Sequence, residues 1–293
     1  MLMLRLRAPA KLNLFLRVLG KRPDGYHEIE TLFERVDLAD ELAFEPHPST
    51  ISLTCNDPAL PVDETNLVLK AAQLLRSRHR VPAGATIHLT KRIPMAAGLG
   101  GGSSDAAAAL RGLAELWQLP LTRKDLEPLA AELGSDVPFF LASSPFAVGR
   151  GRGERCEPLA LDARLVHVLV VPRQRLSTRE VYGGLSVRGE GLTAPAPSIN
   201  ILEHALSNGS LSELACGLRN DLEPEAIRRC PIIATILSEL RQAGCPGVRM
   251  SGSGSAVFGL CIDLAHAEEV AMCLRHSDPD RQIEILQTDV LHD

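Results

Sequence analysis

Apolar residues in the first third of the chain alternate with polar residues or form short runs, which is the pattern of β-strands. Pro, Gly and Asp residues, which favour turns, separate these runs. Strands are predicted over residues 4–6, 12–19, 29–38, 41–44, 51–54 and 85–90. Before the last of these strands, the apolar residues from Leu67 to Leu75 fall on one face at helical spacing, so residues 66–80 are predicted to form an amphipathic helix.

Helices are more frequent in the rest of the chain. The continuous apolar run of residues 165–171 predicts a strand at the centre of a sheet. Helices are predicted over residues 122–133 (capped by Thr122), 200–207, 210–216, 232–243 and 264–274, and strands over residues 256–262 and 282–287. This order of elements predicts an α+β fold, and 293 residues are enough for about two domains.

Two segments rich in glycine interrupt this pattern. Residues 183–197 are rich in Gly, Ser and Pro and are predicted to form a mobile surface loop. Residues 149–153, G-R-G-R-G, are either a turn near the domain boundary or a hairpin of small residues that lets a ligand approach. The sequence favours neither of these two readings strongly.

The glycine-rich segment of residues 94–109 is the most informative part of the chain. Four glycines occur within the five positions from Gly98 to Gly102, between a predicted strand and an alanine-rich run that is typical of a helix. Ser103, Ser104 and Asp105 follow the glycines, where the N-terminus of that helix is expected. Such a turn exposes backbone N–H groups and the positive end of the helix dipole, so a phosphate, most plausibly that of a nucleotide, is the predicted ligand.

A flexible linker is the alternative for this segment, but a linker does not normally lead into an amphipathic helix. Two known phosphate-binding patterns do not fit. No Lys-Ser/Thr pair follows the glycines as in the Walker A pattern, and Ser103 stands where the dinucleotide pattern has its last glycine.

Composition and charge narrow the class of protein. Hydrophobic residues make up 45% of the chain, and the net charge of −5 comes from interspersed acidic and basic residues. No basic stripe suggests a nucleic-acid partner. Residues 1–7 alternate Leu and Arg and lack the continuous apolar core of a signal peptide, and no apolar run approaches the length of a transmembrane helix. The seven cysteines form no C-x-x-C pair and the nine histidines do not cluster with them, so reduced thiols and no metal site are expected. A soluble cytoplasmic protein is therefore expected. For its oligomeric state, on which these features do not bear, the expectation is a monomer or a weak homodimer.

Three shorter segments place polar residues where chemistry is expected. Lys11 and Asn13 lie two apart inside an apolar strand and so share a face, although an ordinary edge strand is the alternative. Tyr26 and His27 follow a Pro-Asp-Gly turn, a position that is more often plain surface than a site. Asp136 lies between small residues and an apolar run, so its carboxylate is expected to be partly buried and paired with a cation.

Together these segments resemble the GHMP kinase superfamily, which includes galactokinase, homoserine kinase and mevalonate kinase. Residues 94–109 resemble its central phosphate-binding motif, and residues 249–256, R-M-S-G-S-G-S-A, resemble its C-terminal glycine motif. The resemblance implies an α+β fold of two domains. Residues 1–155 would form an ATP-binding domain like ribosomal protein S5 domain 2, and residues 156–293 a ferredoxin-like domain, with the active site in the cleft between them.

Three segments are similar to members of this superfamily that act on a cytidine diphosphate-linked polyol: residues 9–14 (P-A-K-L-N-L), 22–27 (R-P-D-G-Y-H) and 134–138 (G-S-D-V-P). The similarity implies that ATP phosphorylates the 2-hydroxyl of a methylerythritol moiety, a step of non-mevalonate isoprenoid-precursor synthesis. A kinase of the superfamily that acts on homoserine or mevalonate is the alternative among enzymes. A nucleotide-binding regulatory module without turnover is the alternative outside them.

The resemblance also implies roles for individual residues. Asp136 matches the catalytic aspartate, which accepts the proton of the attacking hydroxyl. Lys11 matches the lysine that keeps this carboxylate ionised and stabilises charge near the transferred group. The implied ATP-binding residues are Asn66, Leu67, Arg92, Pro94, Gly98, Leu99, Gly100, Gly101, Gly102, Ser103 and Ser104. Mg²⁺ is expected to accompany ATP, with no protein ligand assigned.

The implied substrate site is built around a flat cytosine ring. Tyr26 and Tyr182 would stack on its two faces, and His27 would contact its polar edge. The alternative for Tyr182 is simple packing against Leu185. The other implied substrate-binding residues are Asn13, Asp136 and Thr178.

Overall fold

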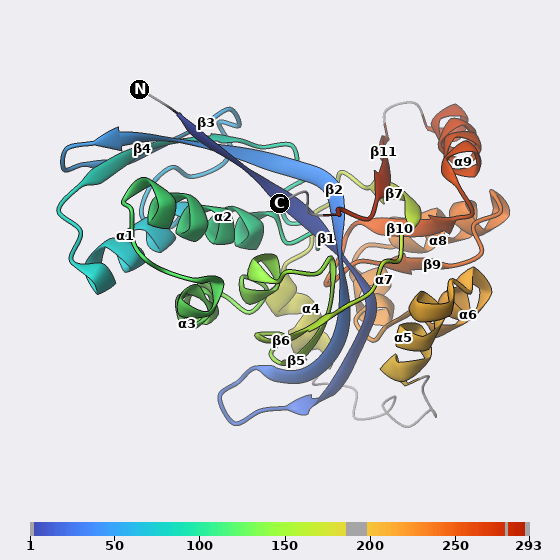
Figure 1. The fold of residues 1–293 in the computed structure, drawn as a ribbon. Helices are drawn as coiled ribbons and strands as arrows, with labels where there is room; N and C mark the ends of the chain where they lie inside the picture. The colour runs from blue at the N-terminus through green and yellow to red at the C-terminus, as the bar shows by residue number, and fades with distance from the viewer. Residues whose placement is uncertain (1–2, 186–197, 279–280, 291–293) are drawn as a thin grey trace. The chain divides into compact units, whose positions relative to one another are not determined.

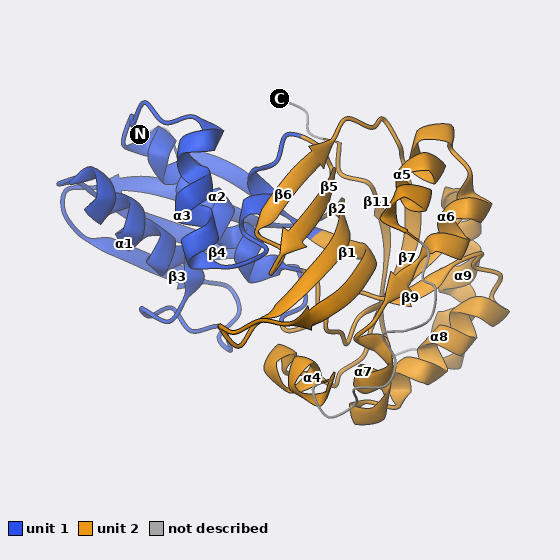
Figure 2. Ribbon diagram, turned by 90° about the horizontal axis from the view of Figure 1, so that it is seen from below, with its two compact units in different colours: residues 1–10, 38–95, 100–143 blue, residues 11–37, 96–99, 144–293 orange. Residues whose placement is uncertain are grey.

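A computed structural model describes residues 3–185, 198–278 and 281–290 of the chain (Figure 1). The chain forms two compact units that are interleaved along the sequence (Figure 2). Unit 1 comprises residues 1–10, 38–95 and 100–143, and unit 2 comprises residues 11–37, 96–99 and 144–293. Neither unit is a continuous stretch, because strands β1 (Leu4–Lys21) and β2 (His27–His47) each belong partly to one unit and partly to the other.

Unit 1 combines a sheet with a layer of helices. Its strands are the first part of β1, the last part of β2, β3 (Ile51–Cys55) and β4 (Gly84–Thr90). β4 pairs antiparallel with β2, where Thr90 is opposite Glu41, and parallel with β3. Its helices are α1 (Leu67–His79), α2 (Gly101–Leu116), α3 (Arg123–Leu133) and the 3₁₀-helix η1 (Pro138–Leu141). Figure 1 shows α1 and α2 along one face of these strands, and α2 also packs against α3 and η1.

Unit 2 contains two groups of paired strands. β5 (Phe146–Gly151) pairs antiparallel with the first part of β2 and with β6 (Arg155–Leu159), and β8 (Arg219–Asn220) pairs parallel with β1. The second group is a sheet in the order β11 (Gln282–Gln287), β7 (Val166–Val171), β10 (Val257–Cys261) and β9 (Val248–Met250), with all neighbours antiparallel. The helices are α4 (Thr178–Leu185), α5 (Ile199–Asn208), α6 (Leu211–Gly217), α7 (Glu223–Arg229), α8 (Ile232–Gln242) and α9 (Leu264–Ser277). α8 and α9 pack against the second sheet.

Local sequence explains where several helices begin. The side chain of Asn66 accepts the backbone N–H of Val68 and so caps α1. Thr122 and Asp125 form a reciprocal capping box at the start of α3. The side chain of Asp263 accepts the backbone N–H of His266 and so caps α9. These caps satisfy backbone N–H groups that have no partner within the helix, which is why helix starts can be predicted from short polar residues.

The predicted α+β class is confirmed, and most predicted elements are present. β7 was predicted at the centre of a sheet; it lies between β11 and β10 and buries every residue except its first. The helices predicted over residues 122–133, 200–207, 210–216, 232–243 and 264–274 correspond to α3, α5, α6, α8 and α9. The division of the chain into two domains at residue 155 stays a prediction.

Some predicted boundaries differ from the structure. The strands predicted over residues 29–38 and 41–44 are the single strand β2, because Asp40 stays in the strand and its carboxylate accepts the backbone N–H groups of Arg92 and Ile93. The strands predicted over residues 4–6 and 12–19 are likewise one strand, β1.

The region before α5 also differs from its prediction. Helix α4 was not predicted at all. Its eight residues include two glycines, and Val181 is the one residue of this helix that is buried, so the apolar pattern in the sequence is weak. Residues 183–185, expected in a mobile loop, end α4, and the rest of that loop, residues 186–197, lies outside the described residues.

Two further observations concern the chemistry of the whole chain. All seven cysteines lie in the described part of the chain, and each of them is free of disulfide bonds. Among the described residues, no helix has both the length and the apolar character needed to cross a membrane.

Gly112 of α2 lies against the ring of Phe44, and a Cβ atom there would be 2.5 Å from Phe44 Cε2. We expect Gly112→Ala to lower the free energy of unfolding. Overpacking costs about 1–3 kcal/mol, whereas Ala is otherwise about 1 kcal/mol more favourable than Gly inside a helix. Urea unfolding measures the net effect. The control is Gly183→Ala in α4, where a Cβ would meet nothing within 4 Å; equal losses in both variants would contradict the packing argument.

Candidate active site

The glycine-rich segment forms the start of α2 in unit 1. Gly100 is the N-cap, with φ of 71°, and the N–H of Ser104 donates to the carbonyl of Gly100 over 2.9 Å. The backbone N–H groups of Gly101, Gly102 and Ser103 therefore have no acceptor within the helix. Together with the positive end of the helix dipole, these three groups favour an anion such as a phosphate.

Asp105 lies inside this helix instead of capping it. The prediction that placed it at the helix N-terminus is wrong, because α2 already begins at Gly101. The carboxylate of Asp105 is buried, and its Oδ2 lies 2.8 Å from Nζ of Lys91. Lys91 also pairs with Asp40, which is fully buried. Nζ of Lys91 would lie 3.2 Å from a Cβ on Gly101, so this charge cluster is directly beside the start of α2.

The two carboxylates share one ammonium group, and their burial changes the titration of the cluster. Burial raises the pKa of Asp105 to about 7; Lys91 opposes this shift and the neighbouring Asp40 adds to it. Burial alone would lower the pKa of Lys91, but Asp105 and Asp40 outweigh it and raise that pKa above its usual value. Oδ1 of Asp105 and Oγ of Ser104 are buried without a hydrogen-bond partner. Asp105 therefore takes up a proton near neutral pH.

Four other predicted ATP-binding residues lie in unit 1. Leu67 is the first residue of α1, and a Cβ on Gly102 would lie 3.8 Å from its Cδ1, so the structure brings Leu67 to the glycine-rich turn. Asn66 caps α1, and its Nδ2 also donates a hydrogen bond of 2.7 Å to the backbone carbonyl of Pro61. Arg92, which is exposed, and Pro94, which is half-buried, lie between β4 and the turn.

Lys11 and Asn13 form a buried polar cluster in unit 2. They lie on β1, which has neighbours on both sides in its sheet, and they hydrogen-bond to each other. Nδ2 of Asn13 donates to Oγ1 of Thr31 on β2 over 2.8 Å. Nζ of Lys11 lies 5.7 Å from the centre of the Phe33 ring, a cation–π distance. The two residues thus share a face, as their spacing predicts, and the alternative of an ordinary edge strand does not apply.

Residues 96–99 of the glycine-rich segment belong to the same unit as this cluster. The backbone N–H of Lys11 donates to the carbonyl of Leu99 over 3.0 Å. The hydroxyl of Ser251, from the C-terminal glycine motif, donates to the carbonyl of Gly98 over 3.0 Å. Gly98 has φ of +82°, and a Cβ there would lie 2.1 Å from the carbonyl oxygen of Ser251, so only glycine fits. The structure therefore brings Gly98 and Leu99 to the predicted catalytic lysine.

The predicted nucleobase residues form two ring contacts in unit 2. Tyr26 is 54% exposed, and the guanidinium of Arg152 lies 4.7 Å from the centre of its ring. The rings of His27 and Tyr182 have centres 5.2 Å apart and are tilted by 34°. Partial burial, with a smaller effect of Lys21, lowers the pKa of His27 below its usual value, so its ring is neutral at pH 7.

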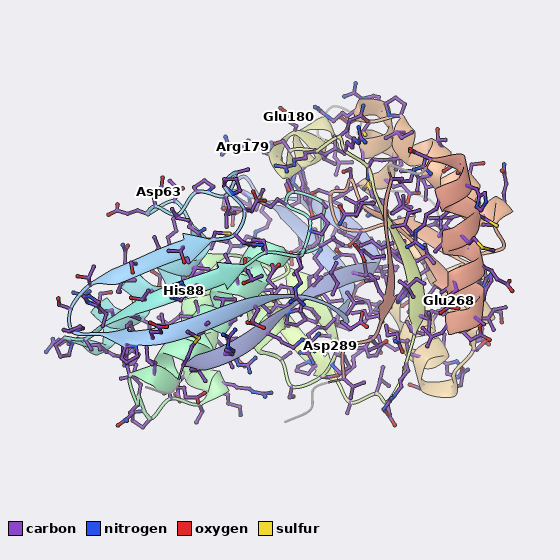
Figure 3. All side chains as sticks on the ribbon, turned by 90° about the horizontal axis from the view of Figure 1, so that it is seen from above. Asp63, His88, Arg179, Glu180, Glu268 and Asp289 are labelled. Carbon is purple, nitrogen blue, oxygen red and sulfur yellow. The ribbon has the colours of Figure 1, made fainter. Side chains whose placement is uncertain are left out.

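Helix α4 carries two of the predicted substrate residues. Oγ1 of Thr178 lies 2.8 Å from Oγ of Ser253 in the C-terminal glycine motif. Tyr182 packs, together with Leu185, against the buried core of unit 2, in addition to its contact with His27. Arg179 and Glu180 lie between Thr178 and Tyr182 and are exposed (Figure 3).

Asp136 is half-buried on the turn that joins α3 to η1 in unit 1. The backbone N–H of Val137 donates to the carbonyl of Gly134 over 3.3 Å and closes this turn. All four residues of η1 (Pro138–Leu141) are buried, which fixes the chain directly after the carboxylate. The partial burial expected from the small and apolar neighbours of Asp136 is therefore present.

Several residues of these clusters carry little or no signal in the sequence. Thr31 and Phe33 lie inside an apolar strand without any motif, and nothing local distinguishes them. Asp40 carries a weak signal, because a carboxylate within a strand that is otherwise buried needs a partner. Arg152 lies in the G-R-G-R-G segment, which the sequence leaves open between a turn and a ligand-approach hairpin.

Comparison with known proteins decides the family. Residues 66–144 match the GHMP kinases N terminal domain, and residues 202–279 match the GHMP kinases C terminal domain. The chain is 45% identical over 282 residues to 4-diphosphocytidyl-2-C-methyl-D-erythritol kinase of Pelotomaculum thermopropionicum, with 96% of each chain covered. The chain belongs to the 4-diphosphocytidyl-2-C-methyl-D-erythritol kinase family. A kinase of the same name from Salinibacter ruber is 42% identical over 276 residues, covering 92% of this chain and 94% of its own.

Solved structures agree with membership of the 4-diphosphocytidyl-2-C-methyl-D-erythritol kinase family. The crystal structure of a 4-(cytidine 5'-diphospho)-2C-methyl-D-erythritol kinase matches with a TM-score of 0.82 and 39% identity, covering 97% of this chain and 98% of that one. Homoserine kinase from Cytophaga hutchinsonii matches with a TM-score of 0.77 at 19% identity, covering 98% and 95%, which shows a shared fold. The expected GHMP kinase fold is thus confirmed.

Asp105→Asn should change how stability depends on pH. The folded-state pKa of about 7 lies above the ordinary 3.8, so the folded protein holds this proton more tightly than the unfolded chain does. The resulting stabilisation is complete below about pH 4 and is lost as pH rises to 7, at no more than about 1.4 kcal/mol per pH unit. Relative to the parent, the variant should therefore gain stability between pH 4 and 7 and level off above pH 7.

Urea unfolding at half-unit pH intervals measures this difference. Glu115→Gln, at an exposed position near the end of the same helix, is the control for a change from carboxyl to amide without burial. If Asp105→Asn follows the parent at every pH, the carboxyl of Asp105 does not titrate near neutral pH in the folded protein.

Proposed function

We propose that this protein transfers the γ-phosphoryl group of ATP to the 2-hydroxyl of 4-diphosphocytidyl-2-C-methyl-D-erythritol, a step of the non-mevalonate route to isoprenoid precursors. The observation that carries this proposal is the relationship to kinases of that name, at 45% identity over 96% of both chains. The phosphate-binding start of α2, the buried lysine on β1 and the aromatic residues near Tyr26 support it as chemistry.

ATP binds with its phosphates at the start of α2. The unpaired backbone N–H groups of Gly101, Gly102 and Ser103 donate to phosphate oxygens, and Ser104 and the preceding residues Gly98, Leu99 and Gly100 complete the turn. Asn66 and Leu67 at the start of α1 contact the adenine, and Arg92 and Pro94 flank the nucleotide. What supports this placement is the short distance between Leu67 and Gly102 within unit 1.

The transfer itself needs a base and neutralised charge more than covalent help from the protein. The oxygen of the 2-hydroxyl forms a bond to the γ-phosphorus, the bond from that phosphorus to the β,γ-bridging oxygen breaks, and ADP leaves. Asp136 accepts the hydroxyl proton. Lys11 offsets the charge on the transferred group, and Asn13 binds the substrate near the reacting hydroxyl.

Mg²⁺ enters as part of the substrate, in its complex with ATP. Among the described residues, no group of three or more His, Cys, Asp or Glu side chains could hold a metal ion. Mg²⁺ commonly binds through substrate phosphates and water with one or two protein ligands, so a site without such a cluster suits it. The ion shields the phosphate charge during the transfer.

The cytidine part of the substrate binds in unit 2. Tyr26 and Tyr182 stack on the cytosine ring, and His27 contacts its edge. A neutral His27 ring carries one donor and one acceptor nitrogen, which suits an edge that has both an amino group and a carbonyl group. Thr178 contributes a hydroxyl beside Ser253 of the C-terminal motif.

A substrate panel tests this function against its alternatives. The purified protein is mixed with MgATP and either the cytidine-linked substrate, homoserine or mevalonate, and ADP release is followed in a coupled assay. We expect release above the rate without acceptor for the cytidine substrate alone. Release with homoserine or mevalonate in its place would assign another GHMP kinase activity, and no release with any acceptor would favour a nucleotide-binding module.

Asp136→Asn tests the assigned base. The amide keeps the size of the side chain but cannot accept the proton, so kcat should fall by about 10²- to 10⁴-fold while the Kd of ATP stays nearly unchanged. Steady-state kinetics and calorimetric titration with ATP measure the two quantities. Glu132→Gln, at an exposed position in the preceding helix α3, is the control and should keep the parental kcat. An Asp136→Asn variant with a near-parental kcat would refute the role.

A further inference from the structure

The G-R-G-R-G segment of residues 149–153 has no part in the proposed reaction, although it lies next to a predicted substrate residue. It forms the end of β5 and the turn into β6. In the antiparallel register of β5 with β2, Gly151 is opposite Ile29. The turn after Gly151 therefore lies beside residues 26–28, which come directly before Ile29 in the chain.

The conformation of this turn is fixed by local contacts. Gly151 has φ of +76°, and a Cβ there would lie 2.7 Å from Oε2 of Glu154. The same oxygen accepts the backbone N–H of Arg152 over 2.6 Å. A side chain at position 151 would displace this carboxylate, so the glycine is needed for the turn. The backbone of Arg152 is thereby held in place beside the start of β2.

The side chain of Arg152 lies over one face of the Tyr26 ring. Its guanidinium is 4.7 Å from the ring centre, within the range of a cation–π contact. Arg150, on the same hairpin, pairs with Glu30 and Glu157. Arg152 itself lies 3.9 Å from Glu154, measured from Nε to Oε2. The two arginines of the G-R-G-R-G segment therefore have different carboxylate partners, and Arg152 is the one that lies over the Tyr26 ring.

Tyr26 is a residue whose orientation needs support. Its side chain is 54% exposed, and its backbone N–H is bound to Oδ1 of Asp24 over 3.1 Å in the turn that carries it. A stacking side chain that samples several rotamers must lose this freedom when the base binds, which weakens binding. A guanidinium on one face removes part of this freedom beforehand, while more than half of the residue stays exposed.

We propose that Arg152 is a positioning residue for the nucleobase: it packs on one face of Tyr26 and holds the opposite face ready to stack on cytosine. The inference rests on the proposed function, because it assigns Tyr26 to the cytidine site. Arg152 acts through Tyr26 and does not take part in the phosphoryl transfer. Its removal therefore weakens binding of the cytidine substrate and leaves the handling of ATP as it is.

Kinetics of Arg152→Ala measure this effect. We expect the KM of the cytidine substrate to rise about two- to five-fold, the loss typical of a partly exposed cation–π contact, with kcat and the KM of ATP unchanged. Arg152→Lys, which keeps a cation but not the flat guanidinium, should recover part of the loss. Arg150→Ala is the matched control from the same hairpin and should keep the parental KM.

A double-mutant cycle separates positioning from a general effect on the hairpin. In the Tyr26→Ala background, Arg152→Ala should add no further rise in KM, because the ring on which it acts is gone. Titration of CDP into the four proteins, followed by calorimetry, should give the same pattern in Kd without turnover. Additive effects in the cycle, an equal rise in the KM of ATP, or a parental KM in Arg152→Ala would each overturn the proposal.

Failure of the proposed function would look different. If the unchanged protein does not phosphorylate the cytidine substrate and does not bind CDP, the function falls and the role of Arg152 falls with it. If the unchanged protein is active, and Tyr26→Ala but not Arg152→Ala weakens CDP binding, the function stands and only the role of Arg152 is refuted.

Discussion

The burial of the Lys11 ammonium group is the constraint on which the unit 2 site depends. Removing a charge from water costs several kcal/mol unless protein groups replace its hydration. Asn13 supplies an amide oxygen and Phe33 a ring face. Asn13 keeps the required orientation because its amide nitrogen donates to Thr31, whose own hydroxyl donates to a backbone carbonyl of β1 over 2.6 Å. Ser251 accepts from the backbone of Asn13 and donates to Gly98, so a single hydroxyl connects this strand to the glycine-rich segment.

A second buried lysine has the corresponding position in unit 1. Lys91 lies between Asp40 and Asp105, close to Gly101 at the start of α2. In each unit, part of the glycine-rich segment therefore lies near a lysine with a buried ammonium group. In unit 2 the carbonyl of Leu99 accepts the backbone N–H of Lys11, and in unit 1 Gly101 lies beside Lys91. Each lysine is held by partners within its own unit: Lys91 by Asp40 and Asp105, and Lys11 by Asn13.

Local patterns in the sequence predict the parts of this site that depend on neighbouring residues. The glycines of residues 98–102, the Lys11–Asn13 pair and the helix caps could be found because each is complete within a few positions. Contacts between distant residues could not. Asn13 meets Ser251 across 238 positions, and Asp40 meets the backbone of Arg92 across 52. The pairing of strands and the packing of helices bring such residues together, and a local pattern does not contain that information. For this reason the sequence wrongly predicted a break between strands at Asp40 and a helix start at Asp105.

The residues that form the fold and the buried lysine cluster differ from those that are assigned to the base of the substrate. Homoserine kinase shares the fold at 19% identity, so the architecture that holds Lys11 and the glycine-rich segment does not by itself select cytidine. Three of the residues that we propose to act at the base, Tyr26, His27 and Arg152, lie within residues 22–28 and on the turn after Gly151. The chain has two tyrosines, and both are found here: Tyr26 contacts Arg152, and Tyr182 contacts His27. The hydrogen bonds that hold Asn13 and Ser251 beside Lys11 involve β1, β2 and the glycine-rich segments, so a substitution in residues 22–28 or in the turn after Gly151 leaves those bonds in place.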